Sequence, residues 1–221
     1  MVDSDVNAHS AGLQSITSLS SAQSLISLSI SRGMPSAALH VLASMDHSLV
    51  LPHSISKDLL TLIVEKGSTN LMVDLRQVLN RKLPPMNLDE DDIGDCITYC
   101  MMKKLPDEAF RWYLILEDRY HLQPNKSIVS VLLPALAKSN SWERLFYVME
   151  ETFRLDIPIS PRTRYQLLQE CSKKSKLRWR YAGYFIKDLD LTIDNLSNVD
   201  GDITAVKCVN LVFSILAREH K

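Results

Sequence analysis

Hydrophobic residues recur along this chain in a pattern that repeats about every 35 residues. In each copy, a small or apolar residue is followed by mostly apolar residues at the first, third, fourth and seventh positions after it, which together form one face of a helix. Successive copies begin 34, 37, 36 and 37 residues apart, at Ala38, Met72, Ala109, Leu145 and Ala182. A steady period in this range is typical of stacked helix pairs.

A single helix pair cannot bury its apolar face alone, so neighbouring pairs stack and share a continuous core. We therefore expect an all-α solenoid of about five helical hairpins with almost no strand. Ala38, Ala109 and Ala182 should be buried where two helices approach each other closely. Such a fold presents an extended surface rather than a single enclosed pocket.

The pattern divides the chain into four parts. Residues 1–21 are expected to form a flexible Ser-rich leader, 22–190 the helical-repeat array, 191–202 a polar loop and 203–221 a capping helix. Within the array we expect helices at 22–31, from about 35, and at 54–65, 70–81, 93–103, 106–120, 127–138, 142–154, 161–172 and 177–189.

Residues at the predicted helix ends favour these boundaries. Gly67 is placed to end one helix, and Ser68 or Thr69 to cap the next. The acidic run at 89–92 comes directly before the helix predicted at Ile93. Carboxylates at this position interact favourably with the helix dipole. A cation site with oxygen ligands around a turn is the alternative interpretation of the same run.

Two segments, 93–125 and 127–160, carry a resemblance to a known family. In the first, residues 107–110 read Asp-Glu-Ala-Phe and residues 123–125 read Gln-Pro-Asn. The first copy of the pattern has a basic residue and a glycine at Arg32-Gly33, followed by Ala38-Leu39. The segments resemble pentatricopeptide repeats, in which a first helix ends in a basic residue, a second opens with acidic residues and alanine, and a Pro-Asn tail closes the unit.

The resemblance extends over residues 22–190 and implies a right-handed α-solenoid that binds single-stranded RNA at one base per repeat. In such repeats a polar residue of the first helix reads a base together with the last residue of the repeat. The resemblance places these readers at Gln23, Lys57, Gly94, Ser130 and Leu167. Ser130, paired with Ser160, is a candidate RNA-binding residue, whereas the side chains of Gly94 and Leu167 offer no hydrogen bond. We therefore expect weak or no sequence-specific reading.

A second resemblance is to the C-terminal helical region of the testis- and ovary-specific PAZ-domain proteins. It implies a role in post-transcriptional regulation in germ cells, including spermatogenesis. The second resemblance also suggests an amino-acid racemase as a possible activity. Such an enzyme uses two cysteines that face each other across a cleft, and it would require an α/β fold. This chain shows neither the predicted strands nor the Gly-rich turns of such a fold, since it has only 6 glycines.

Composition and charge narrow the function further. The net charge is −1, and affinity for nucleic acid rests largely on neutralising phosphates, so an RNA-binding surface must concentrate its basic residues locally. No apolar run reaches the ~18 residues of a membrane helix, and we expect no membrane partner. Four sparse cysteines favour a reducing compartment, and the N-terminus lacks the features of a targeting signal, so we expect a cytoplasmic protein.

A basic segment near the end of the array is the candidate RNA-binding site. Its cations alternate with Trp179 and Tyr181, so they would contact phosphates while the rings stack on bases. A solvated surface without a ligand is the alternative interpretation. The candidate residues are Lys173, Lys174, Lys176, Arg178 and Arg180.

The remaining reactive residues favour no catalytic or metal centre. Cys96 and Cys100 lie four residues apart on one apolar helix face, which indicates core packing rather than a zinc knuckle. No nucleophile is paired with a base, and the histidines show no metal-binding spacing. We therefore expect no catalytic residue, no metal, no cofactor and no small-molecule substrate. The six histidines are His9, His40, His47, His53, His121 and His220.

These observations predict a non-enzymatic helical-repeat binding module that is linked to RNA through the family resemblance. The alternative is a protein–protein interaction scaffold without direct RNA contact. The distribution of charge separates the two interpretations. A basic stripe along the first helices favours RNA, whereas an apolar groove favours a peptide or helix partner.

Overall fold

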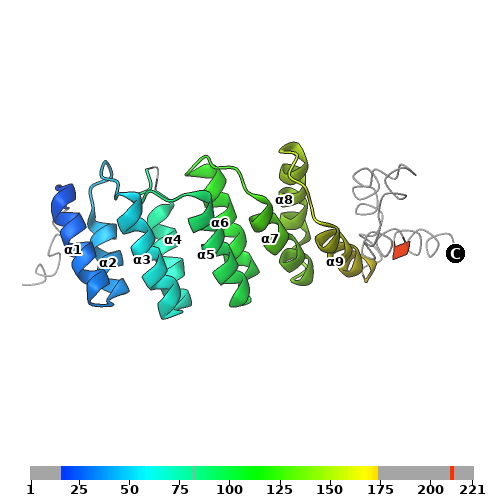
Figure 1. Ribbon diagram of the computed structural model, residues 1–221, viewed down its shortest axis with the longest axis horizontal. Helices are drawn as coiled ribbons and strands as arrows, with labels where there is room; N and C mark the ends of the chain where they lie inside the picture. The colour runs from blue at the N-terminus through cyan, green and yellow to red at the C-terminus, as the bar shows by residue number, and fades with distance from the viewer. Residues whose placement is uncertain (1–15, 82, 174–209, 212–221) are drawn as a thin grey trace, which may run out of the picture. The chain divides into compact units, whose positions relative to one another are not determined.

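The computed structural model describes residues 16–81, 83–173 and 210–211, and in these residues the chain is helical (Figure 1). The described residues form nine helical elements and no strand, apart from two isolated backbone bridges. None of these helices combines the length and the apolar character that crossing a bilayer requires. The helices are α1 Leu19–Ser31, α2 Pro35–Ser44, α3 His53–Lys66, α4 Thr69–Leu79, α5 Glu90–Met102, α6 Pro106–Asp118, α7 Lys126–Lys138, α8 Trp142–Arg154 and α9 Pro161–Ser172.

The helix boundaries agree closely with those predicted from the hydrophobic pattern. Two helices begin three residues early: α1 at Leu19, so that 19–21 are helical rather than part of a leader, and α5 at Glu90. The helix predicted at 177–189 lies outside the described residues. Of the predicted capping helix only 210–211 are described, and both residues are helical.

Two compact units divide the chain. Unit 1 comprises Met1–Cys96 and Arg111–Gln123, and unit 2 comprises Ile97–Phe110 and Pro124–Lys221. The helices α5 and α6 therefore contribute residues to both units.

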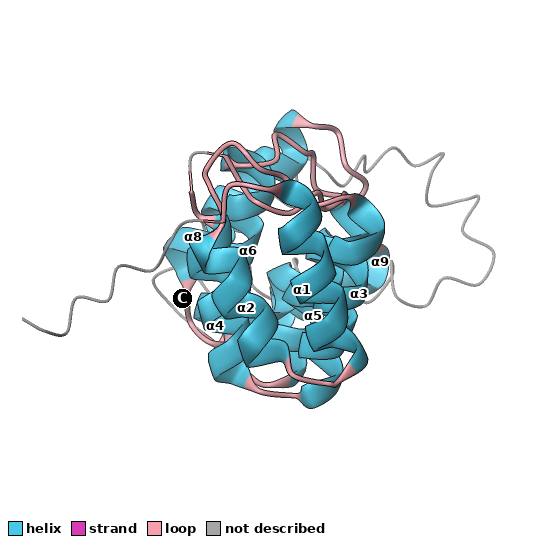
Figure 2. Cartoon of the chain, turned by 90° about the vertical axis from the view of Figure 1, so that its left-hand side faces the viewer, coloured by secondary structure: helices cyan, strands magenta, loops and turns pink. Residues whose placement is uncertain are grey.

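Unit 1 is built from two layers of helices. The first helices of its hairpins, α1 and α3, lie side by side in one layer, and α2 and α4 form the other (Figure 2). Backbone hydrogen bonds also join segments that lie about one repeat apart. The N–H of Ile16 donates to the carbonyl of Ser44 (2.9 Å), and the N–H of Leu51 donates to that of Pro85 (2.8 Å).

The residues that begin each copy of the pattern are buried, as predicted. Ala38, Ala109 and Leu145 are fully buried, and Met72 is 1% exposed. The seventh position after each of these residues is buried as well, so the apolar face continues along each second helix. These seventh positions are Met45, Leu79, Leu116 and Thr152. Ala182 lies outside the described residues.

The turn between α3 and α4 has the predicted chemistry. Gly67 ends α3 with a φ of 65°, a left-handed conformation that glycine adopts without steric cost. Ser68 caps α4, because its hydroxyl oxygen accepts a hydrogen bond from the N–H of Leu71 (3.5 Å). This pair sets where the first helix stops and the second begins.

The acidic run forms the start of α5. The N–H of Asp92 donates to Oδ1 of Asp89 (2.9 Å), and the N–H of Asp89 donates back to Oδ2 of Asp92 (3.2 Å). This reciprocal pair satisfies two N–H groups that a helix start leaves without intrahelical partners. The helix therefore begins within the acidic run rather than after it.

In unit 2, α7 packs against both α8 and α9. Arg144 on α8 pairs with Asp107 at the start of α6, and its guanidinium lies 5.4 Å from the ring centre of Phe110. That ring meets Tyr147 edge to face at 5.9 Å. An ion pair, a cation–π contact and an aromatic pair thus join two second helices that belong to neighbouring hairpins.

Candidate nucleic-acid interface

The first helix of each of the four described hairpins is followed by a left-handed backbone turn at an equivalent position. Glycine and asparagine adopt this conformation at low cost, whereas the Cβ of a lysine is strained in it. At these turns the residues with positive φ are Gly33 (63°), Gly67 (65°), Lys104 (59°) and Asn140 (59°), while His121 (53°) and Asp156 (52°) have positive φ after the second helices α6 and α8. Lys104 therefore occupies a position at which the backbone favours glycine.

Basic side chains gather at these same ends of the first helices. In unit 2 they are Lys103 and Lys104 after α5, Lys138 at the end of α7 and Lys173 directly after α9. All four are exposed. Lys104, Lys138 and Lys173 follow one another at intervals of 34 and 35 residues, which is the period of the repeat. We call these four residues the basic row of unit 2.

Unit 1 carries a counterpart at the ends of α1 and α3. Arg32 and Lys66 are both exposed and lie 34 residues apart in the chain. The Nζ of Lys66 lies 3.5 Å from the point at which a Cβ on Gly33 would stand. The end of one first helix is therefore within reach of the lysine on the next.

The lysines of the basic row keep most of their charge available for a ligand. Lys173 pairs with Glu170 at 2.8 Å, but it is 62% exposed, and exposed pairs of this kind are weak. The Nζ of Lys103 lies 5.5 Å from the ring centre of Tyr99. Among the described residues, no carboxylate forms an ion pair with Lys104 or Lys138.

A groove of about 520 Å³ lies beside this row, within unit 2. One wall comes from the end of α5 and the start of α6, and the other from the face of α7. Its apolar surface lies between Lys104 on one wall and Lys138 on the other. The lining residues are Met101, Lys104, Pro106, Val131, Pro134, Ala135, Lys138 and Ser139.

The structure describes only part of the basic segment predicted as the binding site. Lys173 is exposed at the end of α9, where it joins the basic row. Lys174, Lys176, Arg178 and Arg180 lie outside the described residues, so their role stays a prediction.

Three of the positions predicted for base reading have described surroundings, namely Ser130, Ser160 and Leu167. The Ser130 hydroxyl donates to the carbonyl of Ser127 (2.8 Å), so it is already used within α7. Ser160 caps α9, accepting from the N–H of Thr163 at 3.1 Å. Leu167 is fully buried. Whether these positions read a base stays a prediction.

The sequence interpretation did not include Lys104 and Lys138 among the candidate RNA-binding residues. The signal was present in the chain, since both residues follow the repeat interval that leads to Lys173.

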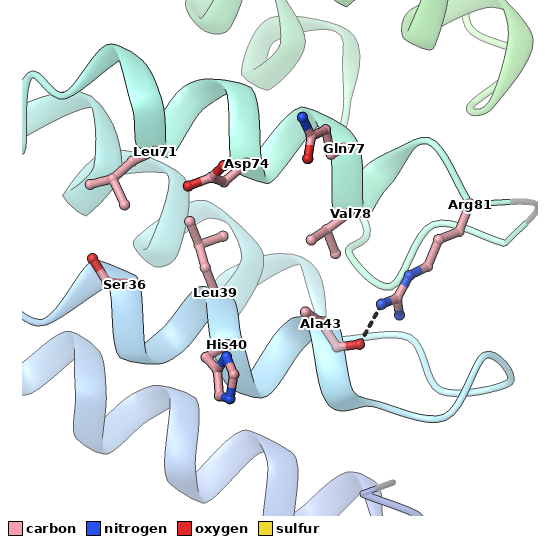
Figure 3. Close-up of a pocket in the computed structure, with 9 residues that line it drawn as sticks. All are labelled: Ser36, Leu39, His40, Ala43, Leu71, Asp74, Gln77, Val78 and Arg81. Carbon is pink, nitrogen blue, oxygen red and sulfur yellow. Dashed lines mark hydrogen bonds between the residues drawn. The ribbon is translucent and has the colours of Figure 1, made fainter. Parts of the chain in front are cut away.

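A second hollow, of about 370 Å³, lies between α2 and α4 of unit 1 (Figure 3). Polar and apolar side chains alternate in it, among them His40, Asp74 and Val78. Arg81 reaches across its end and donates to the carbonyl of Ala43 (Figure 3). The carbonyl at the end of α2 accepts a hydrogen bond from the Arg81 guanidinium. Arg81 is therefore engaged in joining two hairpins and is less available to bind a nucleic acid.

The acidic start of α5 meets two basic groups of α3. A nitrogen of His53 and an oxygen from each of Asp89 and Asp92 lie within 4.8 Å of one another. Burial raises the pKa of Asp92, while the backbone N–H of Asp92 lowers the pKa of Asp89. Lys57 also approaches Asp92, with Nζ 4.0 Å from Oδ1. A cation would have to compete with this ammonium and with the helix dipole, so the cluster fits the capping interpretation better.

The described cysteines and Trp112 are core residues. Cys96, Cys100 and Trp112 are fully buried, and Cys171 is 1% exposed. Burial raises the pKa of the Cys171 thiol, which keeps it in the unreactive protonated form. The interpretation of Cys96 and Cys100 as packing residues is confirmed.

No protein-family model matches the chain, and no curated protein matches it. Among solved structures, it is similar to the pentatricopeptide repeat protein PPR10 in complex with an 18-nucleotide psaJ RNA element, with a TM-score of 0.50 and 16% identity over 89% of this chain. It is also similar to PPR10 from maize, with a TM-score of 0.54 and 16% identity over 87% of this chain.

The chain spans only 27% and 26% of the length of these two proteins. At 16% identity the likeness concerns the fold and not the ligand. The helices, their period and these structural neighbours together show that the chain has the all-α helical-repeat solenoid fold seen in pentatricopeptide repeat proteins.

Proposed function

We propose that this protein is a non-enzymatic module that binds single-stranded RNA through the phosphate backbone and reads its sequence weakly or not at all. The contact centres on the basic row of unit 2, and the segment that holds Lys174, Lys176, Arg178 and Arg180 extends it. The fold it shares with PPR10, which was solved with an RNA element, supports this proposal.

The observation that carries the proposal is the recurrence of exposed lysines at the ends of first helices. Lys104, Lys138 and Lys173 lie at or just after the ends of α5, α7 and α9. A polymer with one negative charge per nucleotide is a suitable ligand for cations that repeat along a surface. Lys104 strengthens the case, because it stands where the backbone favours glycine.

The kind of contact proposed supports the expectation of weak base reading. Phosphate contacts fix a nucleic acid in place but carry no sequence information directly. The hydroxyl groups of Ser130 and Ser160 are already hydrogen-bonded within the protein. We therefore propose a role in post-transcriptional regulation that tolerates different RNA sequences. We place this role in the cytoplasm, and germ cells are the first cell type in which to test it.

The proposal includes no catalytic step. Cys96, Cys100 and Cys171 are buried, and a thiol buried in apolar surroundings is a poor nucleophile. Measuring amino-acid racemisation by the full chain would test this part directly. A rate above background that Cys171→Ser abolishes would contradict it.

The basic row is tested by neutralising one lysine at each end of the same helix. Lys138 ends α7 within the row, whereas Lys126 begins α7 and lies outside the row. Lys138→Gln should weaken binding of every single-stranded RNA tested and lower the salt slope by about 0.7, the value for one phosphate contact on a single strand. Lys126→Gln is the matched control and should leave both values near those of the parent.

A protein–protein scaffold is the alternative function, and one observation favours it. Leu25 and Leu28, three residues apart on α1, are 45% and 46% exposed. Residues at this spacing share a helix face, so they offer an apolar patch to a partner. The alternative takes first place if the chain shows no RNA binding at low salt.

A further inference from the structure

The groove of unit 2 has a chemistry that the phosphate contacts alone do not explain. Its α7 wall is formed by Val131, Pro134, Ala135 and Lys138, which share one face of the helix. A volume of about 520 Å³ falls within the range of small-ligand pockets. A surface that bound only phosphates would not need an apolar hollow between its lysines.

We propose that this groove receives a nucleobase of the bound RNA while Lys104 and Lys138 hold neighbouring phosphates. The inference rests on the proposed function and adds a base subsite to it. That subsite lies near the ends of α5 and α7, away from the hydroxyl of Ser130.

Charge complementarity selects the occupant. The groove has two lysines and no acidic residue in its lining, so it suits a ligand that is flat, apolar in its centre and negatively charged at its edge. A nucleotide unit of single-stranded RNA meets these three conditions, because its base is unpaired and its phosphates lie on either side. The lysines involved belong to the same basic row that contacts the backbone.

The side chains of the groove provide little further discrimination. The hydroxyl of Ser139 already donates to the carbonyl of Leu136 (3.0 Å). The lining contains no aromatic ring on which a base could stack. We therefore expect a modest gain in affinity for any base over no base, rather than a preference for one base.

Two oligomers separate the base subsite from the phosphate contacts. One is an eight-nucleotide oligouridylate, and the other has the same backbone with abasic sites. The full chain should bind the first about fivefold more tightly, because a partly buried base adds apolar contact worth about 1 kcal/mol. Lys138→Gln should weaken the binding of both oligomers.

A groove-filling variant then tests the location. Ala135→Trp places a ring in the groove and should reduce the affinity for oligouridylate to that for the abasic oligomer. Ser127→Trp is the matched control, since it adds the same ring to an exposed position at the other end of α7. It should leave the fivefold difference in place. Circular dichroism melting checks that both variants are folded.

A measurement on the unmodified chain keeps the test independent of variant folding. RNA with 4-thiouridine should crosslink to residues 101–106 or 131–139 when irradiated. Crosslinks found only at other residues would overturn the inference. Equal affinity for the two oligomers would also overturn it, but the proposed phosphate contacts would then still stand. An acidic peptide that crosslinks to the groove and displaces neither oligomer would also overturn it. If neither oligomer binds at low salt, the proposed function falls as well.

Discussion

At the scale of single residues, the positions that matter most are those where two demands on one side chain compete. Lys104 is such a position, because the turn favours glycine and the proposed interface favours a cation. Ser160 is another, because a hydroxyl that caps a helix is not available to read a base. Each conflict leads to a prediction that separates stability from binding.

Lys104→Gly should stabilise the fold and weaken RNA binding. Relief of the left-handed strain is worth about 1–2 kcal/mol, and the extra freedom of glycine in the unfolded chain offsets about 0.5–1 kcal/mol of that. The net gain in the free energy of unfolding should therefore be up to about 1 kcal/mol in a urea titration. Gly67→Lys, at the equivalent turn of unit 1, is the control and should change stability in the opposite direction. A lower midpoint for Lys104→Gly would contradict the strain at this turn.

Ser160→Ala should have the reverse profile. Loss of the N-cap of α9 should lower the free energy of unfolding by about 1 kcal/mol. RNA affinity should not change, because the hydroxyl is engaged with the N–H of Thr163. The idea would fail if the variant kept its stability but bound RNA more weakly, since Ser160 would then act as a reader.

At the scale of helices, the structure depends on close approach between the two members of each hairpin. The small residue Ala38 is fully buried on α2, which packs against α1. A larger side chain there has no space, and the helices must separate to admit it. This property belongs to the packed pair and is absent from either helix alone.

Ala38→Leu should therefore destabilise the protein by about 1–3 kcal/mol through overpacking. Ala43→Leu is the matched control, because Ala43 lies on the same helix and is exposed. It should change the free energy of unfolding by less than about 0.5 kcal/mol. Comparable losses in the two variants would mean that Ala38 does not mark a close approach.

The positions of the helices could be predicted from the sequence because the signals are local. The apolar period, Gly67 and Ser68 act within a few residues of the boundary they set. The start of α5 was misplaced, since the mutual capping of Asp89 and Asp92 drew the acidic run into the helix. Contacts one repeat apart, such as Arg81 with the carbonyl of Ala43, depend on the path of the loops and have no local signal.

The candidate site was predictable in part. Lys173 was identified by its basic neighbours, and the repeat interval would have led from it to Lys138 and Lys104. The groove between α5 and α7 could not be predicted, because its shape depends on how these helices pack. It also depends on the path of the turn between α5 and α6, which contributes Lys104 to the lining. Pro134 gave no hint of it, since a proline inside a predicted helix indicates only a local defect.

At the scale of the whole molecule, the balance between overall and local charge is decisive. The chain carries 25 basic and 26 acidic residues, so no general attraction draws it to RNA. In the proposed function, the attraction to RNA comes from the basic row and the adjoining basic segment. The likeness to PPR10 at 16% identity concerns the fold, so it does not decide whether that charge is used.

The most direct test of this account measures, by fluorescence anisotropy, how the full chain binds mixed-sequence single-stranded RNA at two salt concentrations. If only the three lysines that follow the repeat interval, Lys104, Lys138 and Lys173, each contact one phosphate, the affinity should fall roughly twentyfold between about 50 and 200 mM salt. Contacts from further basic residues should make the fall steeper. Unrelated sequences should give nearly the same values. Tight binding to one sequence that is insensitive to salt would contradict the account, as would the absence of binding at about 50 mM salt.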